Sequence, residues 1–380
     1  MKIISKLPDV GVTIFTVMSK LAMDNNAINL SQGFPEFDVD SELVSLVGKY
    51  MKKAKNQYAP MQGVDSLREK ISEKTEAVYG HKANPDTEIT VTMGATEALF
   101  AAFTAIIKPG DEVLLFEPAY DSYEPAIRLS GGKPVFCQLQ YPGYDIDWNQ
   151  VKSLLSEKTK MIVFNSPHNP SGAILRSADM EVLSDLVENT GIVIVSDEVY
   201  EHIVFDGLRH ESMLRYPSLS ARSFVISSFG KTFHATGWKT GYCIAPAALT
   251  KEFRRIHQYL TFACNTPIQH AYAEFLDQDK RYLNLSEFYQ RKRDTFLDSI
   301  KGSRFKPLRC SGTYFQMLDY SEISKDKDLD FAKWLTIEKG IASIPPSVFY
   351  HQKTDHKVLR FCFAKNDETL RSAGEILKTI

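Results

Sequence analysis

The sequence predicts an α/β fold in which helices cover a mostly parallel sheet, followed by a second, smaller α/β domain. From about residue 88 to residue 246, short runs rich in β-branched residues alternate with longer segments of helical periodicity. Most of these runs are continuously apolar, which is typical of strands buried on both faces. A chain of 380 residues also exceeds one average domain, so two domains are expected.

Seven strands are predicted for the large sheet, each from one short apolar run: 89–93, 112–116, 134–139, 161–165, 192–196, 224–228 and 241–245. Helices are expected between them, for example over 95–107 and 178–188, and a long helical stretch follows from 251 to 275. In the smaller domain the pattern predicts helices over 288–300, 328–339 and 367–380, and strands over 313–320 and 358–364.

Three regions are expected along the chain. They are an N-terminal segment over 1–40, a large domain over 41–275 and a small domain over 276–380. The N-terminal segment contains Asn29-Leu30-Ser31-Gln32-Gly33-Phe34-Pro35, whose glycine and proline predict a loop. We expect this segment to pack with the small domain and to fold back over a site.

Composition restricts the kinds of molecule that the protein is expected to bind. The formal net charge of -2 leaves no basic excess for nucleic acid or an anionic membrane, so small molecules are expected. No run approaches a membrane span, and charges interrupt the first fifteen residues, which argues against a signal peptide. The five cysteines are scattered, which predicts a cytoplasmic protein without a disulfide framework. The histidines form no ligand cluster, so no metal is expected.

The most specific chemistry lies at Ser228-Phe229-Gly230-Lys231, eight residues before Lys239. An amine, hydroxyls and a second cation at one strand end suit pyridoxal 5'-phosphate, held by its phosphate and joined to the lysine as a Schiff base. Ser228 and Lys231 with Lys239-Thr240-Gly241 are also similar to the serine-nucleophile motifs of β-lactamases. Here the two motifs lie within fourteen residues and no Ser-Asp-Asn separates them, so the cofactor interpretation is favoured.

Ligands bind at the carboxyl ends of strands in an open parallel sheet, so residues that follow the apolar runs are candidates. Gly94-Ala95-Thr96 begins a predicted helix whose free N–H groups could bind a phosphate, or it forms an ordinary cap. Asn169 lies in a turn rich in proline and glycine and could donate to a phenolic oxygen.

Two further positions carry ionisable groups. Asp197 ends the run 192–196 and could keep a pyridine nitrogen protonated while Tyr200 bonds the ring oxygen, or it could only cap a helix. Arg360 lies on an apolar strand of the small domain, where its planar fork suits an α-carboxylate. A buried ion pair is the alternative for Arg360.

Five motifs, taken in order, resemble those of the class I aminotransferases among the fold-type I pyridoxal-phosphate enzymes, and within them the methionine and kynurenine aminotransferase group. They are Ser31-Gln32-Gly33-Phe34-Pro35, Asn56-Gln57-Tyr58-Ala59-Pro60, Gly94-Ala95-Thr96-Glu97-Ala98-Leu99, Ser196-Asp197-Glu198-Val199-Tyr200-Glu201 and Gly230-Lys231-Thr232-Phe233. The resemblance covers nearly the whole chain and implies the fold-type I architecture, with a seven-stranded sheet in the large domain.

The resemblance also implies roles around the cofactor. Lys231 forms the Schiff base and moves the α-proton, Asp197 pairs with the pyridine nitrogen, and Tyr120 stacks on the ring. Asn169 and Tyr200 address the ring oxygen. The phosphate is held by Gly94, Ala95, Thr96, Ser228 and Lys239. Many relatives have arginine at the position of Lys239, so charge neutralisation is expected there in place of bidentate binding.

The substrate and the assembly are implied in the same way. Gly33 and Arg360, with Asn169, bind the substrate carboxylate, although Gly33 read alone is a turn glycine. Ile14, Phe15 and Tyr120 suggest an apolar or thioether pocket, and residues 259–269 contain no arginine for a second carboxylate. Methionine and aromatic or apolar amino acids are therefore the expected donors, with 2-oxo acids as acceptors. Tyr58 implies a homodimer with shared active sites.

Two alternatives stay open at the level of sequence. The same residues could catalyse β-elimination of cysteine S-conjugates, since removal of the α-proton is common to both reactions. A regulator that retains the fold without catalysis is the second alternative, and the absence of an appended DNA-binding segment argues against it.

Overall fold

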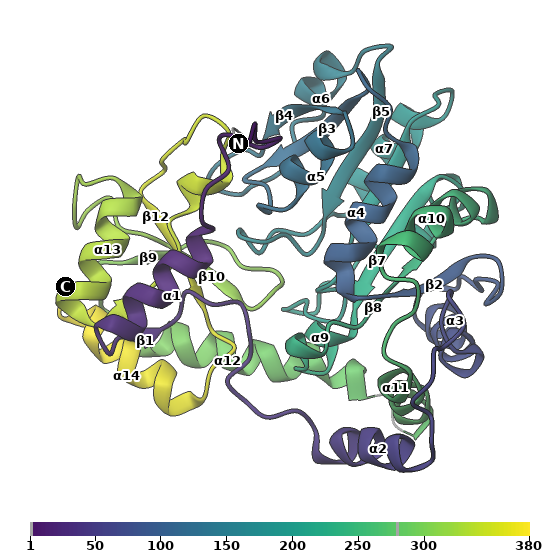
Figure 1. Ribbon diagram of the computed structural model, residues 1–380. Coiled ribbons are helices and arrows are strands. Elements are labelled where there is room, and N and C mark those ends of the chain that lie inside the picture. The colour runs from purple at the N-terminus through teal and green to yellow at the C-terminus, as the bar shows by residue number, and fades with distance from the viewer. Residues whose placement is uncertain (1–2, 279–280) are drawn as a thin grey trace.

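The computed structural model describes residues 3–278 and 281–380. Its large sheet has the strand order β2-β8-β7-β6-β5-β3-β4 (Figure 1). The strands are β2 Ile89–Thr92, β3 Glu112–Glu117, β4 Lys133–Gln138, β5 Thr159–Asn165, β6 Val193–Asp197, β7 Ser223–Ser228 and β8 Gly241–Ile244. Each overlaps a predicted run, so the seven-stranded, mostly parallel sheet is confirmed.

One strand of the large sheet runs against its neighbours. β8 pairs antiparallel with β2 and β7, whereas the other pairings in this sheet are parallel. Gly241, the first residue of β8, pairs with Thr92 of β2 and with Ser228 of β7. The chain that leads into β8 therefore meets the ends of both neighbours at one edge of the sheet.

Helices cover both faces of the large sheet because successive strand side chains point to opposite sides. In β3, Val113 and Leu115 join a core with α4, α5 and α10, whereas Leu114 and Phe116 join the core of the other face with α3 and α7. The helices of this part are α2 Ser41–Lys52, α3 Asp65–Tyr79, α4 Gly94–Ile106, α5 Tyr123–Leu129, α6 Trp148–Leu154, α7 Ser177–Val187, α8 Pro217–Ser220, α9 Phe229–Thr232, α10 Ala247–Leu260 and α11 Thr266–Gln278.

The long helical stretch predicted over 251–275 contains two helices, α10 and α11. Between them Phe262 adopts a left-handed backbone with φ 67°, which no helix continues through. Asn265 then accepts a hydrogen bond from the backbone N–H of Ile268 at 3.1 Å, as a capping side chain does at a helix start. The helical character of the stretch is confirmed, and the break within it was not predicted because the apolar periodicity continues across it.

The smaller part combines two sheets with helices. β9 Lys306–Pro307, β10 Phe315–Asp319 and β12 Val358–Cys362 form an antiparallel sheet, and β1 Ile28–Asn29 pairs in parallel with β11 Ile341–Ala342. Its helices are α12 Leu285–Ser299, α13 Asp328–Lys339 and α14 Asp367–Lys378, with α1 Ile14–Asp24 packed beside α13 (Figure 1). The predicted helices and strands of this region are confirmed, whereas the boundaries at residues 41 and 276 stay a prediction.

Within residues 3–278 and 281–380, no helix has both the length and the apolar character needed to cross a membrane. In the same described residues, no group of three or more His, Cys, Asp or Glu side chains is arranged to hold a metal ion.

Candidate active site

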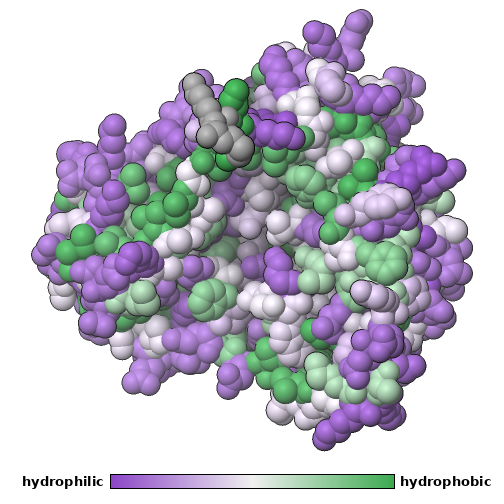
Figure 2. All heavy atoms as spheres, viewed as in Figure 1, coloured by the Kyte–Doolittle hydropathy of each residue, from purple (hydrophilic) through white to green (hydrophobic). Residues whose placement is uncertain are grey.

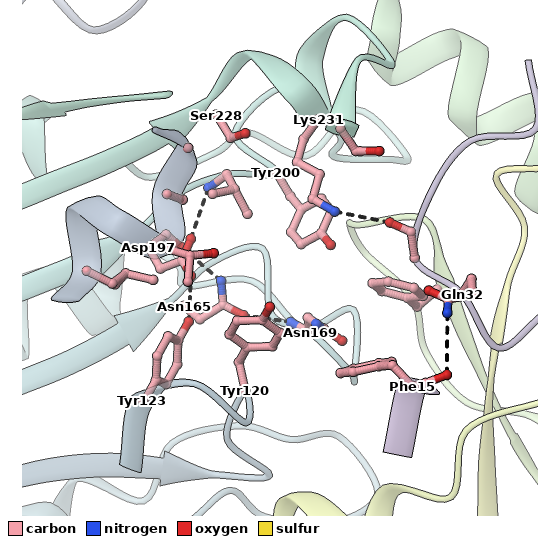
Figure 3. Close-up of a pocket in the computed structure, with 18 of the residues that line it drawn as sticks. Phe15, Gln32, Tyr120, Tyr123, Asn165, Asn169, Asp197, Tyr200, Ser228 and Lys231 are labelled. Atoms are coloured by element: carbon pink, nitrogen blue, oxygen red, sulfur yellow. Dashed lines mark hydrogen bonds between the residues drawn. The ribbon is translucent and has the colours of Figure 1, made fainter. Parts of the chain in front are cut away.

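A cavity of about 310 Å³ opens between the large sheet and the smaller part of the protein. Figure 2 shows the surface hollowed between the two parts, and Figure 3 shows side chains from both pointing into the hollow. The lining comes from strand ends of the large sheet, from α1 and the loop after β1, and from β10 and β12.

Strand direction explains why residues far apart in sequence meet here. β5, β6 and β7 are parallel and end at Asn165, Asp197 and Ser228, so these side chains share one edge of the sheet. Because β8 is antiparallel and begins at the same edge, Lys239 reaches it from the opposite direction. Ser228 and Lys239 therefore line one end of the cavity although eleven positions separate them.

The start of α4 completes this end of the cavity. Gly94 has φ 73°, a left-handed conformation that favours glycine, and it begins α4 directly after β2. Gly241 lets the backbones approach, because a Cβ there would lie 2.7 Å from the Ser227 carbonyl oxygen and 3.0 Å from the Gly94 carbonyl carbon. The first N–H groups of α4, at Gly94, Ala95 and Thr96, have no partners within the helix and line the cavity. The arrangement suits an anion.

Lys231 projects its amine into the cavity from α9. Lys231 Nζ donates to Tyr314 Oη at 2.8 Å and to the Gly33 carbonyl oxygen at 3.1 Å. Burial lowers the pKa of Lys231 to about 8, and the nearby Arg360 and Lys239 charges act in the same direction, while Cys362 and Asp197 oppose it. An amine with this pKa has a far larger unprotonated fraction near neutral pH than an exposed lysine, and the unprotonated form is the nucleophile.

Asp197 lies across the cavity at the end of β6. Burial raises the pKa of Asp197 to about 6, although the hydrogen bond from Tyr123 opposes the shift. Tyr123 Oη donates to Asp197 Oδ2 at 2.6 Å, and the amide of Asn165 donates to the Asp197 carbonyl oxygen at 2.9 Å (Figure 3). A buried carboxylate without a cation is costly, so a cationic group in the cavity would be favoured here.

Arg360 is fully buried on β12, where an ionised side chain is rare without specific partners. Its Nη1 donates to Asn169 Oδ1 and its Nη2 to the Ser31 carbonyl oxygen, both at 2.8 Å. Nε has no hydrogen-bond partner. The guanidinium carbon lies 3.9 Å from the centre of the Phe315 ring. Both observed partners are neutral oxygens, so the cation is free to bind a carboxylate.

Aromatic rings form the remaining wall. Phe15 of α1 lies with its ring centre 5.3 Å from the Arg360 guanidinium carbon, and Phe315 and Tyr120 line the cavity with it. Gln32 joins the wall through its side-chain amide, which donates to the Phe15 carbonyl oxygen at 3.4 Å and to Ser19 Oγ. This end of the cavity therefore has an apolar wall beside a buried cation.

Most of the predicted site residues come together around this cavity. The lining includes Phe15, Gly33, Gly94, Ala95, Thr96, Tyr120, Asn169, Asp197, Tyr200, Ser228, Lys231, Lys239 and Arg360. Two predicted residues lie outside the lining. Ile14 packs against the main core from the first position of α1, and Tyr58 is 84% exposed with its ring against Phe262.

Several residues of the lining and its support were not among the predicted site residues. Tyr123, Asn165, Gln32 and Phe315 line the cavity, and Tyr314 bonds the amine of Lys231. Asn165 ends a predicted strand, so the rule used for Asp197 could have found it. The aromatic residues carry no such signal, because tyrosine and phenylalanine are ordinary core residues.

Comparison with known families now identifies the fold and its class of chemistry. Residues 25–377 match the model of the family described as aminotransferase class I and II. The chain belongs to the class I and II aminotransferases. The predicted family is therefore confirmed, and the β-lactamase interpretation of the serine and lysine motifs is set aside.

Individual relatives of this aminotransferase agree with the family model. Methionine aminotransferase of Escherichia coli K12 is 49% identical over 99% of this chain and 98% of its own. Kynurenine–oxoglutarate transaminase of Dictyostelium discoideum is 36% identical over 97% and 94% of the two chains. A solved E. coli structure, identified as having a methionine aminotransferase function, matches with a TM-score of 0.98 and 49% identity over 100% of both chains. The aminotransferase thus shares its whole architecture with these proteins.

Proposed function

We propose that this aminotransferase uses pyridoxal 5'-phosphate to move the amino group of methionine, or of an aromatic or apolar L-amino acid, to a 2-oxo acid. One observation carries the proposal: a single cavity joins the amine of Lys231, the carboxylate of Asp197 and the guanidinium of Arg360. The amine can form a Schiff base with the cofactor carbonyl, and the acid can pair with its ring nitrogen. The guanidinium can bind the substrate carboxylate through two hydrogen bonds.

The residues present fit that cofactor. The first turn of α4, Ser228 and Lys239 supply N–H groups, a hydroxyl and a cation for a phosphate, and the close approach of the backbones beside them depends on glycine at Gly241. Asp197, whose raised pKa reflects burial without a positive partner, would hold a protonated ring nitrogen. Tyr120 would cover one face of the ring, and Asn169 and Tyr200 lie where a ring oxygen could be bonded.

When bound, pyridoxal phosphate supplies a carbonyl that exchanges amines and a ring that accepts electrons. Lys231 is the base of the reaction in this proposal. Its Nζ, when it is free, would take the proton from the substrate α-carbon, hold it as an ammonium group and later give it back. Asp197 would hold the ring nitrogen in its protonated form.

Arg360 would bind and orient the substrate α-carboxylate. Its bonds to Asn169 and Ser31 fix the plane of the guanidinium, and stacking on Phe315 keeps that plane in place. Gly33 belongs to the same loop as Ser31, and its small size is required because a Cβ there would lie 2.8 Å from the Phe315 ring. A carboxylate held at Arg360 places the α-carbon toward Lys231.

The substrate side chain is expected to meet Phe15 and Tyr120, which line the cavity, whereas Ile14 lies outside the lining. The cavity lining contains no cation besides Lys231, Lys239 and Arg360, so within the described residues no fourth cation awaits a side-chain carboxylate. An apolar or thioether side chain suits this wall. The names of the relatives, which refer to methionine and kynurenine, support the same choice.

The proposal includes a homodimer in the cytoplasm. Tyr58, Tyr259 and Phe262 are 84%, 85% and 49% exposed, and the rings of Tyr58 and Phe262 meet edge to face at 5.4 Å. Exposed aromatic side chains of this kind mark interaction surfaces. A second copy would cover them and would bring Tyr58 toward the partner's phosphate site. All five cysteines are free and buried, which supports a reducing compartment.

A spectroscopic titration tests the proposal. Purified protein mixed with pyridoxal phosphate should show a visible absorption band that disappears on addition of methionine or phenylalanine and returns with a 2-oxo acid. Lys231→Ala should lose the band and the turnover together. A Lys231→Ala variant with normal turnover would overturn the assignment of the base, and aspartate as the best donor would overturn the substrate class. Pyruvate and ammonia released from a cysteine conjugate without an oxo acid would indicate β-elimination.

A further inference from the structure

The amine of Lys231 has a specific partner outside the predicted site, the phenol of Tyr314. Lys231 Nζ donates to Tyr314 Oη at 2.8 Å, and Tyr314 Oη donates in turn to the Gly33 carbonyl oxygen at 2.6 Å. The amine donates to that same carbonyl oxygen at 3.1 Å. Three groups from three separate elements therefore form a closed triangle. Figure 3 shows the amine of Lys231 turned toward the loop that contains Gln32.

Two tyrosine rings enclose the amine. Lys231 Nζ lies 5.5 Å from the ring centre of Tyr200 and 5.4 Å from that of Tyr314, and the two rings meet edge to face at 5.1 Å. Tyr314 is fully buried, so its hydroxyl needs a partner. The triangle satisfies that hydroxyl and holds the amine at the same time.

The backbone before Tyr314 adopts an uncommon conformation. Thr313 has φ 67°, a left-handed value that is rare for a β-branched residue. Its N–H donates to the Ile203 carbonyl oxygen at 3.0 Å, and its hydroxyl accepts from the Phe315 N–H at 3.2 Å. Strained residues that their surroundings hold in place are concentrated at functional sites. Here the strained turn directs the next side chain at Lys231.

We propose that Tyr314 is a positioning residue for Lys231: its hydroxyl, with the Gly33 carbonyl, holds the amine whenever that amine is not joined to a cofactor. The part of this inference that concerns catalysis rests on the proposed function. The loop from Ser31 to Gly33 also bonds Arg360 through the Ser31 carbonyl. The same short loop thus contacts both the base and the carboxylate site.

The amine without cofactor gives a direct test. Cofactor-free protein is acylated over a range of pH, and the label on Lys231 is measured by peptide mass spectrometry. Tyr314→Phe removes an acceptor that favours the ammonium form, so its labelling curve should move to lower pH by about one unit. The other charged and titratable groups that face the amine are unchanged in this variant: Asp197, Tyr200, Arg360, Lys239 and Cys362.

Tyr289→Phe is the matched control. Tyr289 is fully buried, its ring centre lies 5.6 Å from that of Tyr314, and its hydroxyl has no hydrogen-bond partner. Its labelling curve should coincide with that of the wild type. Coincident curves for wild type and Tyr314→Phe would overturn the proposal. If Tyr314→Phe does not fold, 3-fluorotyrosine at position 314, a weaker acceptor, should give a smaller shift in the same direction, and no shift would overturn the proposal.

This result is separate from the cofactor assignment. A shift in the labelling curve together with a wild type that gives no visible band with pyridoxal phosphate would support the role of Tyr314 and refute the proposed cofactor. A visible band without the shift would give the reverse conclusion.

Discussion

The phenol of Tyr123, on α5, donates to the Oδ2 atom of Asp197 at 2.6 Å, which joins a helix on one face of the sheet to a strand end at the cavity. Burial raises the pKa of Asp197 to about 6, and this hydrogen bond limits the rise. A residue that the predicted site did not include therefore opposes the effect of burial on the ionisation of Asp197.

Asp197→Asn should stabilise the cofactor-free protein at neutral pH. The carboxyl pKa is 3.8 when unfolded and about 6 when folded, so wild type binds more protons folded and loses stability as pH rises from 3.8 to 6. The difference in the free energy of unfolding between variant and wild type should grow by roughly 2–3 kcal/mol between pH 3.5 and pH 7. Thermal unfolding across this range measures it. A constant difference would contradict the raised pKa.

In Tyr123→Phe the pKa of folded Asp197 should rise further, because the carboxylate loses the hydrogen-bond donor that favours its charged form. The pH range over which the protein loses stability should therefore extend upward by about one pH unit. Tyr272→Phe is the control, since Tyr272 is fully buried and its hydroxyl has no partner. Both variants are compared by unfolding from pH 4 to pH 8. Identical pH dependence in the two variants would show that the hydrogen bond does not control the carboxyl group.

Lys231→Met should also stabilise the cofactor-free protein, with the opposite pH dependence. The amine pKa is 10.5 when unfolded and about 8 when folded, so the cost of burying the charge is complete below pH 8 and is lost as pH rises to 10.5. The variant should be more stable by on the order of 3 kcal/mol at pH 7 and by much less at pH 10.5. The exposed Lys251→Met substitution, which changes no buried charge, should show neither effect.

Arg360→Gln should lower kcat/KM for methionine by about 100-fold or more, because the α-carboxylate loses a charge-assisted, two-bond partner. Arg360→Lys should have a kcat/KM between those of the wild type and Arg360→Gln, since lysine keeps the positive charge but cannot make two parallel hydrogen bonds to a carboxylate. An amine that has the methionine side chain and no carboxylate provides the control. If its slow reaction with the cofactor fell by the same factor, Arg360 would not be the carboxylate site.

Tyr259→Asp should convert the proposed dimer into monomers, because it places a charge at an exposed aromatic position three residues before Phe262, whose ring packs against Tyr58. Leu208→Asp is the control at another exposed apolar position, where Leu208 is 50% exposed. Light scattering after size-exclusion chromatography measures the mass of each. A wild type of monomer mass with full activity would refute the shared site.

Much of the fold could be predicted from sequence because buried parallel strands are continuous apolar runs. The direction of β8 could not, since its run from Gly241 to Ile244 is equally apolar in either orientation. The two-residue strands β1, β9 and β11 are too short for any periodicity. Their pairing depends on contacts with distant segments.

The residues of the site also divide into those that the sequence predicts and those that it does not. Asp197 and Ser228 could be predicted because each is a polar residue where an apolar run ends. Tyr314 could not, because it precedes β10 by one residue and its importance depends on the left-handed turn at Thr313. Charged and hydroxyl-bearing residues at strand ends indicate a site in the sequence. An aromatic residue that positions other site residues cannot be distinguished by sequence from a residue of the hydrophobic core.

The antiparallel β8 has a consequence for engineering. The pairing of Ser228 with Gly241 fixes both ends of the segment 229–240, which carries Lys231 and Lys239. An extra residue in this segment cannot be absorbed by sliding a strand, because a one-position slip would turn the buried side chains of β8 to the wrong face. Length variation, tags and grafted peptides should therefore be tolerated elsewhere on the surface and rejected here.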